Sequence, residues 1–355
     1  MYGNFFDMKA TIEDSIKAQE KFLKMYETML DVKSNQANQT PRECVFEEDK
    51  LKLYHYDKST RTVSKTPTLI VYALVNTPSM MDIGQDKSFI KKLVDGGQDM
   101  YLIEWGFPTA DDKYLTLDDY INIYIDDCVD YIRKEKGVDK INLLGVCQGG
   151  TFSLMYTALH PEKIKNLVTM VTPVDFSTDD GLLFKWGKYL NPDRMVEAFG
   201  VIPSDFMNTG FLTLRPVSLM VNKYVDVIND LDDADYLSNF MTMEKWIFNS
   251  PDQAGMAYKE FLNSMYRENL LYKGEMEIGG EKVDLKKITQ PVLNLYAERD
   301  NQVPNAASIP MEKCVGSKDY TGKSFPTGHI GLFVSKRSQE EVAPTVVDWL
   351  KKHAK

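Results

Sequence analysis

A single cysteine stands between two glycines in the string GVCQG at positions 145–149. The apolar run Ile141–Leu144 before it predicts a buried strand, and Thr151–Tyr156 after it predicts a helix. A strand, a sharp turn and a helix around one nucleophile form a nucleophile elbow, in which Cys147 replaces the more usual serine. Because the elbow strains its backbone, a side chain at either glycine is expected to collide with the neighbouring strand or helix.

An acid and a histidine that could activate this thiol follow later in the chain. Asp300 comes just after the predicted strand Pro291–Ala297, and His329 lies on a later glycine-flanked loop. The histidine would take the thiol proton, and the aspartate would fix its tautomer and stabilise the imidazolium. Asp175 is the alternative acid, because it also follows a predicted strand. The order nucleophile, acid, histidine is that of the α/β-hydrolase fold.

The apolar segment Pro67–Val75 predicts another buried strand, and Asn76 opens the loop that follows it. In the α/β-hydrolase fold this loop gives one backbone N–H to the oxyanion hole, and the residue after the nucleophile gives the other. The expected donors are therefore the backbone N–H of Gln148 and that of Val75 or Asn76.

A cysteine nucleophile indicates a particular kind of acyl chemistry. A thiolate that attacks a thioester forms another thioester, so the exchange is nearly balanced in energy and the acyl group stays activated. The acyl group can then pass to a hydroxyl. Cys147 therefore favours acyl transfer from a thioester over simple ester hydrolysis.

Strands and helices alternate through the first half of the chain, which predicts a parallel sheet covered on both faces. This rhythm stops between about residues 176 and 285, where the sequence is helical and rich in Met, Phe, Tyr and Trp. We expect an α/β-hydrolase fold with a catalytic core at 41–175 and 286–355 and a mostly helical cap at 176–285. Residues 1–40 are expected to form an amphipathic helix, at about 8–31, and a linker.

Several smaller features are expected to be structural. Thr116 and Asp119 resemble a capping box at the start of a long helix that Gly137 ends, and Cys128 falls on its apolar face. His55 is expected to be a strand residue and His160 a helix-terminal one. Cys44 and Cys314 lack any catalytic context.

Composition excludes some classes of function. The chain has 355 residues and a formal net charge of −10, which disfavours nucleic acid as a partner. Its apolar runs are shorter than the roughly 20 residues of a membrane span, and its N-terminus lacks the pattern of a signal peptide. The four cysteines have no metal-like spacing, so we expect reduced thiols, a cytoplasmic location and neither metal nor cofactor.

The chain also resembles the poly(3-hydroxyalkanoate) synthases, and its length is similar to that of the catalytic subunit of their class III, two-subunit type. The resemblance runs from about Pro41 to Trp349. It rests on five segments: Tyr72–Asn76, Leu143–Thr151, Met170–Phe176, Met243–Phe248 and Gly328–Gly331.

The resemblance implies an α/β-hydrolase core, a mobile cap and a Cys147–His329–Asp300 site that polymerises 3-hydroxyacyl-CoA, with 3-hydroxybutyryl-CoA as the expected substrate. It implies His329 as the base, with Asp300 either supporting it or helping the incoming hydroxyl. It also implies a growing polyester chain, a second synthase subunit, a homodimer or hetero-oligomer, and location at polyester granules. The family often has histidine after this aspartate, whereas this chain has Asn301, which puts in doubt an accessory role there.

Two other readings remain open on the sequence. A thioesterase or lactone hydrolase could use the same elbow and would release free hydroxy acid instead of polyester. A non-enzymatic protein with a hydrolase fold would form neither product. The residues that hold CoA are not located by the sequence, which has no P-loop and no dense basic cluster.

Overall fold

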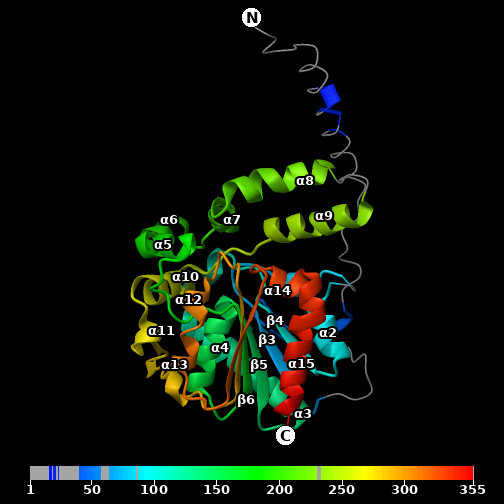
Figure 1. Cartoon of the computed structure of the whole chain (residues 1–355). Coiled ribbons are helices and arrows are strands. Elements are labelled where there is room, and N and C mark those ends of the chain that lie inside the picture. The colour runs from blue at the N-terminus through cyan, green and yellow to red at the C-terminus, as the bar shows by residue number, and fades with distance from the viewer. Residues whose placement is uncertain are drawn as a thin grey trace, which may run out of the picture.

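The computed structural model describes residues 16–17, 19–20, 23, 40–56, 64–84, 87–229 and 233–354. The amphipathic helix predicted at about 8–31 therefore lies almost wholly outside the described residues. Within them the chain forms one large sheet flanked by helices, with further helices above one end of the sheet (Figure 1).

The main sheet has eight strands in the order β1-β2-β4-β3-β5-β6-β9-β10. The pairs β1–β2 and β2–β4 are antiparallel, and all other pairs are parallel. The strands are β1 (Arg42–Glu48), β2 (Leu51–Tyr56), β3 (Thr68–Val71), β4 (Met100–Glu104), β5 (Ile141–Val146), β6 (Ile164–Met170), β9 (Val292–Ala297) and β10 (Tyr320–Phe325), with a separate hairpin of β7 (Glu277–Ile278) and β8 (Glu281–Lys282).

The burial of each strand explains whether it can be recognised in the sequence. Every residue of β5 is buried, as expected for a central parallel strand covered on both faces. In β2, Leu51 and Leu53 are buried and Lys52 between them is exposed, which is the alternation of a strand with one covered face. The predicted strand Pro67–Val75 is wrong at its end, since β3 stops at Val71 and the loop begins four residues earlier than expected.

Helices cover both faces of the sheet. The α-helices are α2 (Phe89–Asp95), α3 (Asp126–Lys136), α4 (Gln148–Leu159), α5 (Leu182–Tyr189), α6 (Pro192–Phe199), α7 (Ser204–Thr213), α8 (Lys223–Asn229), α9 (Ala234–Phe248), α10 (Gly255–Phe261), α11 (Leu270–Lys273), α12 (Asn305–Ser308), α13 (Met311–Cys314), α14 (Gly331–Val334) and α15 (Ala343–Lys352). Shorter 3-10 or π-helical stretches are η2 (Pro78–Met81), η3 (Ala110–Tyr114), η4 (Asp119–Ile125), η5 (Ser218–Asn222), η6 (Leu262–Arg267), η7 (Leu285–Lys287) and η8 (Ser338–Val342).

The predicted start and end of the long helix η4–α3 are confirmed. Thr116 N–H donates to Asp119 Oδ2 at 2.7 Å, and Asp119 N–H donates back to Thr116 Oγ1 at 3.3 Å, as in a capping box. Gly137 ends the helix with a φ of 62°, a left-handed conformation that favours glycine. Cys128 is fully buried on the apolar face, as expected.

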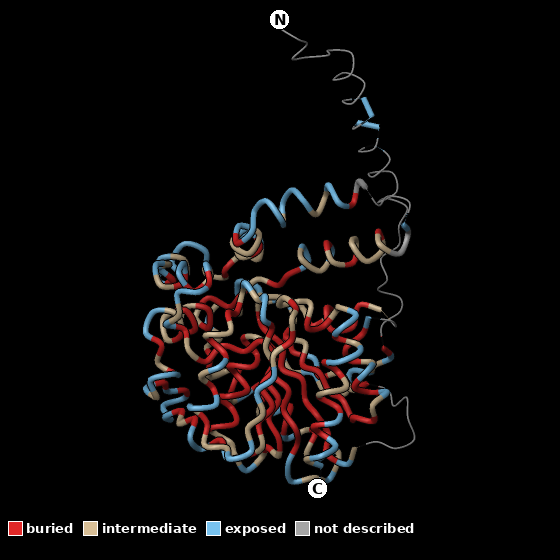
Figure 2. The backbone as a smooth tube through the Cα atoms, in the orientation of Figure 1, coloured by how far each residue is buried: buried red, intermediate tan, exposed pale blue. Residues whose placement is uncertain are grey.

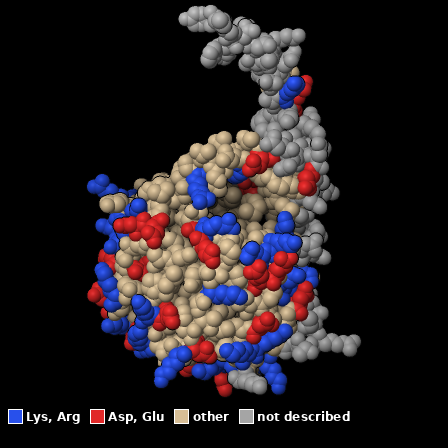
Figure 3. All heavy atoms as spheres, in the orientation of Figure 1, with Lys and Arg blue, Asp and Glu red and all other residues tan. Residues whose placement is uncertain are grey.

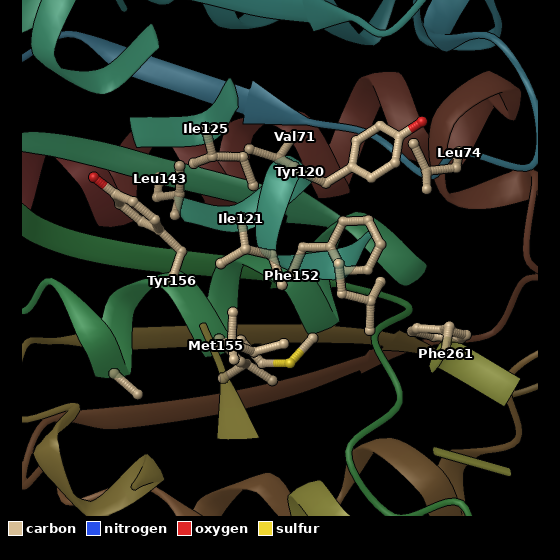
Figure 4. Packing of buried hydrophobic residues seen from close by; sticks show 14 of the residues in the cluster. Val71, Leu74, Tyr120, Ile121, Ile125, Leu143, Phe152, Met155, Tyr156 and Phe261 are labelled. Atoms are coloured by element: carbon tan, nitrogen blue, oxygen red, sulfur yellow. The ribbon is translucent and has the colours of Figure 1, made fainter. Parts of the chain in front are cut away.

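Two hydrophobic clusters hold the layers together, and the sheet and its neighbouring helices are the most buried part of the chain (Figure 2). One cluster joins the sheet to α4, η4 and α3, and Figure 4 shows Phe152, Met155 and Tyr156 of α4 packed among Ile121, Ile125 and Leu143. The other joins the opposite face to α2 and α15. Helix α4 is buried almost all round, which fixes the elbow that precedes it.

The long insertion between β6 and β9 divides into two parts in space. Helices α5 to α9 lie above the sheet, whereas α10 and α11 lie beside it (Figure 1). Tyr258, Phe261 and Met265 belong to the same hydrophobic cluster as α4. The part of the insertion that overlies the sheet is therefore smaller than the whole helical segment, and the predicted unit boundaries at 176 and 285 stay a prediction.

Candidate active site

The nucleophile elbow has the predicted geometry. Cys147 sits between β5 and α4 with φ 54° and ψ −122°, a strained conformation for a residue with a side chain. Its backbone N–H donates to Met170 O at 2.9 Å, which ties the turn to the next strand. A Cβ added at Gly145 would lie 2.5 Å from Ser153 Oγ of α4, and one added at Gly149 would collide with the carbonyl oxygens at the end of β3. Both glycines are therefore required by close approach, as expected.

The acid and the histidine follow the carboxyl ends of the last two parallel strands of the sheet. Asp300 follows β9 and His329 follows β10, and His329 Nδ1 lies 2.7 Å from Asp300 Oδ2. The other carboxylate oxygen, Oδ1, accepts the backbone N–H groups of Gln302 at 2.8 Å and Val303 at 2.9 Å. The Asp300 side chain is fully buried and that of His329 is 9% exposed, so the carboxylate is held in one orientation toward the ring.

His329 also lines the same cavity as Cys147 and interacts with its sulfur electrostatically, so the structure brings the three predicted residues together. Burial lowers the pKa of His329. The Asp300 carboxylate and, after it, the Cys147 sulfur together raise this pKa by more than burial lowers it, so the pKa of His329 is about 10. An imidazolium is thus favoured at neutral pH, next to the Cys147 sulfur.

The competing residues lie elsewhere. Asp175 Oδ1 accepts bonds from Ser177 and from Asn269 Nδ2, so it organises a turn instead of facing His329. Asn301 is exposed, and its side chain donates to Arg299 O at 3.2 Å.

The remaining cysteines and histidines serve other contacts. Burial raises the pKa of Cys128 and of Cys314, which makes both thiols poor nucleophiles. His55 bonds Asp99 at 2.8 Å from within β2, and His160 bonds Asn122 at 2.9 Å at the end of α4.

A hydrogen bond that could not be predicted from the sequence joins the loop after β3 to the elbow. Leu74 N–H donates to the side-chain oxygen Oε1 of Gln148 at 3.0 Å. Gln148 thus contributes its side chain to holding the loop, in addition to the backbone N–H predicted as an oxyanion donor. As the first residue of α4, it also has a backbone N–H with no acceptor within the helix. Val75 and Asn76, together with Tyr72 and Ala73, line the same cavity as Cys147, and the donor role of Val75 or Asn76 stays a prediction.

Cys147 and His329 open into a cavity of about 1060 Å³ between the sheet and the helices above it. Its walls are mostly apolar and come from α5, α7, α9, α10 and η6. Helix α9 closes over the loop after β3, because Trp246 Nε1 donates to Thr77 O at 2.8 Å. The sulfur thus faces a mostly apolar space.

Among the described residues, no group of three or more His, Cys, Asp or Glu side chains is placed to hold a metal ion. Within the same residues, no helix combines the length and apolar character needed to cross a membrane. On the face shown in Figure 3, acidic and basic side chains are interspersed over the core.

The sheet order, the elbow and the acid–histidine pair define an α/β-hydrolase fold. A family profile described as "alpha/beta hydrolase fold" matches residues 69–336. Among solved structures, a putative lipase from Sulfolobus solfataricus has a TM-score of 0.56 at 16% identity, covering 88% of this chain and 99% of that one. A monoacylglycerol lipase from Paleococcus ferrophilus has a TM-score of 0.53 at 15% identity, covering 86% and 100%. These likenesses concern the fold alone.

Sequence relatives define the family more narrowly. A profile described as "Poly-beta-hydroxybutyrate polymerase (PhaC) N-terminus" matches residues 6–93. The chain is 51% identical to the poly(3-hydroxyalkanoate) polymerase subunit PhaC of Allochromatium vinosum, over 91% of this chain and 92% of the relative. It is 44% identical to the protein of the same name from a Synechocystis strain, over 97% and 93%. The chain therefore belongs to the poly(3-hydroxyalkanoate) polymerase family, whose members are acyltransferase enzymes, and the resemblance seen in the sequence is confirmed.

Proposed function

We propose that this enzyme polymerises 3-hydroxyacyl-CoA, with 3-hydroxybutyryl-CoA as substrate, into poly(3-hydroxyalkanoate) and releases CoA through a covalent cysteine thioester. One observation carries the proposal. Cys147 and a buried, hydrogen-bonded His329–Asp300 pair open into one largely apolar cavity that is large enough for an acyl chain of several units.

In the first step the Cys147 sulfur attacks the thioester carbonyl of the substrate. The thiol proton is held by His329, and the Asp300 carboxylate stabilises this imidazolium. The oxyanion of the tetrahedral intermediate accepts N–H bonds from Gln148 and from Val75 or Asn76. When the intermediate collapses, the bond to the CoA sulfur breaks, and CoA leaves as a thiol with the proton from His329.

In the second step the hydroxyl end of a growing chain attacks the acyl-Cys147 thioester. His329 takes the hydroxyl proton, the new ester forms, and the proton returns to the Cys147 sulfur as it leaves. Water would compete with this hydroxyl and would end the chain. The mostly apolar wall of the cavity under α7 and α9 supports transfer over hydrolysis, because it offers water few hydrogen-bond partners near the thioester.

The proposed reaction uses neither metal nor cofactor, since CoA enters with the substrate and leaves as a product. The proposed partners are a second synthase subunit and a further copy of this chain, in a homodimer or hetero-oligomer. We place the enzyme in the cytoplasm at the surface of polyester granules, and not in a membrane or on nucleic acid. The name "polymerase subunit" borne by the relatives supports a multi-subunit enzyme.

Product analysis tests the proposal. The purified chain, alone and with its partner subunit, is incubated with 3-hydroxybutyryl-CoA, and CoA release, insoluble polyester and free hydroxy acid are measured. We expect CoA release to be matched by polyester. Free hydroxy acid as the main product in both conditions would instead indicate a thioesterase, and the proposal would be wrong.

A further inference from the structure

The first part of the loop between β3 and η2 is held by the core of the protein. Leu74 N–H donates to the Gln148 side chain at 3.0 Å, and Gln148 is the first residue of the buried helix α4. Trp105 Nε1, just after β4, donates to Tyr72 O at 3.0 Å. These two bonds fix the loop as far as Leu74, independently of the helices that lie above the sheet.

The end of the loop is fixed in the core as well. Pro78 begins η2, in which Met80 and Met81 are fully buried. Between the two fixed points lie three residues, 75–77, and all of them are only partly buried. The predicted oxyanion donors, the backbone N–H groups of Val75 and Asn76, thus belong to a short span between two anchors.

Two hydrogen bonds within and next to this span are local. Thr77 N–H donates to Asn76 Oδ1 at 2.7 Å, and the hydroxyl groups of Thr77 and Ser79 lie 2.8 Å apart. Neither of these bonds joins the span to the sheet. They therefore shape the turn without fixing where its backbone N–H groups point relative to Cys147.

The helices above the sheet hold the span from the other side. Trp246 Nε1, on α9 (Figure 1), donates to Thr77 O at 2.8 Å. Helix α9 is joined in turn to α7, because Asn208 Nδ2 donates to Ile247 O at 2.8 Å. The Trp246 bond therefore connects the position of these helices with the position of the loop that carries the predicted donors.

We propose that Trp246 is a positioning residue: by holding Thr77 O, it places the backbone N–H donor that precedes Thr77 toward the substrate carbonyl. The proposal rests on the proposed function and adds that Cys147 is acylated rapidly only when the helices above the sheet are in place. An oxyanion donor is effective when it is preorganised around the position where the charge develops. A bond to the neighbouring peptide group restricts the donor without touching the reacting atoms. The helices that overlie the cavity would thus also complete the oxyanion hole.

Loss of this bond should slow a step that forms an oxyanion and spare one that does not. Removal of a whole oxyanion donor lowers the rate by about 10²- to 10³-fold. Here the donor is kept and its placement is loosened by one neutral hydrogen bond, so we expect a loss of roughly three- to tenfold. Attack of the Cys147 sulfur on iodoacetamide forms a carbon–sulfur bond and expels iodide, with no oxyanion. The ratio of the acylation rate to the alkylation rate therefore isolates the effect on the oxyanion hole.

Trp186 on α5 offers a matched control. Its indole lines the same cavity as that of Trp246, but its N–H has no hydrogen-bond partner among the described residues. Phenylalanine at either position removes the same atoms from the cavity wall. Only Trp246→Phe also frees the loop.

The test measures acylation and alkylation of Cys147 in the wild type, Trp246→Phe and Trp186→Phe, as full-length chains with the partner subunit and well below the Tm of each. Acylation is followed as CoA release in single turnovers, with enzyme in excess over 3-hydroxybutyryl-CoA. Alkylation is followed by mass spectrometry of the Cys147 peptide after timed exposure to iodoacetamide. For Trp246→Phe we expect a maximal acylation rate roughly three- to tenfold below that of the wild type and an alkylation rate at least about half that of the wild type. Trp186→Phe should keep the wild-type ratio of the two rates.

Each other outcome counts against the positioning role. An unchanged acylation rate in Trp246→Phe would overturn it, and so would an equal fall in both rates, which would assign the bond to the nucleophile or to the fold as a whole. The same fall of the ratio in Trp186→Phe would show that indole area in the cavity wall is what matters, which also contradicts the proposal. If the wild type releases no CoA in a single turnover, the proposed function itself fails. That result is distinct from a wild type that is acylated and a Trp246→Phe variant that is acylated equally fast.

Discussion

Replacement of Asp300 by asparagine tests how the nucleophile is activated. The variant keeps the shape of the side chain but removes the charge that lies 2.7 Å from His329 Nδ1. With the carboxylate present, the pKa of His329 is raised from 6.5 to about 10, although burial acts in the opposite direction. Since one pKa unit corresponds to about 1.4 kcal/mol, the imidazolium is favoured by several kcal/mol, and Asp300 is the larger of the two causes that raise it.

Without that charge, burial dominates and the pKa of His329 falls. At pH 7 the ring is then protonated less often, so the Cys147 sulfur loses part of its cationic partner. We expect alkylation of Cys147 by iodoacetamide at pH 6–7 to slow by roughly tenfold or more. The polymerisation rate should fall by about 10²- to 10⁴-fold, as for other triads that lose their acid.

Mass spectrometry of the Cys147 peptide after timed alkylation at several pH values measures the effect. Asp319→Asn is the matched control, because Asp319 also bonds a histidine, His353 at 3.0 Å, but on the surface. This control should leave the profile unchanged. If Asp300→Asn kept the wild-type pH profile, the activation inferred from the geometry would be refuted.

Two further substitutions test the elbow and the cap. Gly149→Ala places a Cβ against carbonyl oxygens at the end of β3, so it should lower the free energy of unfolding by about 1–3 kcal/mol, as measured with denaturant. Gly210→Ala is the control and should not destabilise the fold, because a Cβ added at Gly210 meets no atom of the described residues within 4 Å apart from its chain neighbours and its own helix backbone. Equal stability of the two variants would contradict the collision. Trp246→Phe removes the 2.8 Å bond to Thr77 O and should increase amide exchange in α9 by roughly fivefold, for a bond worth about 1 kcal/mol. Trp349→Phe is its control, because the Trp349 indole N–H is buried without a partner among the described residues. Unaltered amide exchange in Trp246→Phe would mean that the bond to Thr77 does not hold α9 in place.

Local patterns in the sequence predict much of the site. The elbow is a short motif whose glycines, strand and helix are contiguous, so its geometry follows from a few neighbouring residues. Asp300 could be assigned because it follows the end of a predicted parallel strand, and His329 because it lies on a later glycine-flanked loop, in the order nucleophile, acid, histidine. The resemblance of five segments to one family then narrowed the chemistry.

Features made by distant residues could not be read in this way. Strand β10 carries a glycine and an exposed lysine in Gly322-Lys323, so this edge strand lacks the apolar run that marks the central strands. The bond from Leu74 to the Gln148 side chain joins residues 74 positions apart.

The most direct test of the whole account is to trap the acyl group during turnover. The chain is mixed with 3-hydroxybutyryl-CoA, with its partner subunit present, quenched in acid within the first turnovers, digested and analysed by mass spectrometry, with Cys147→Ala treated in parallel. The account predicts 3-hydroxybutyryl or its oligomers on the Cys147 peptide, lost on treatment with hydroxylamine, and neither adduct nor polymer from Cys147→Ala. Polymer formed by Cys147→Ala, or an acyl group on a different residue, would contradict it.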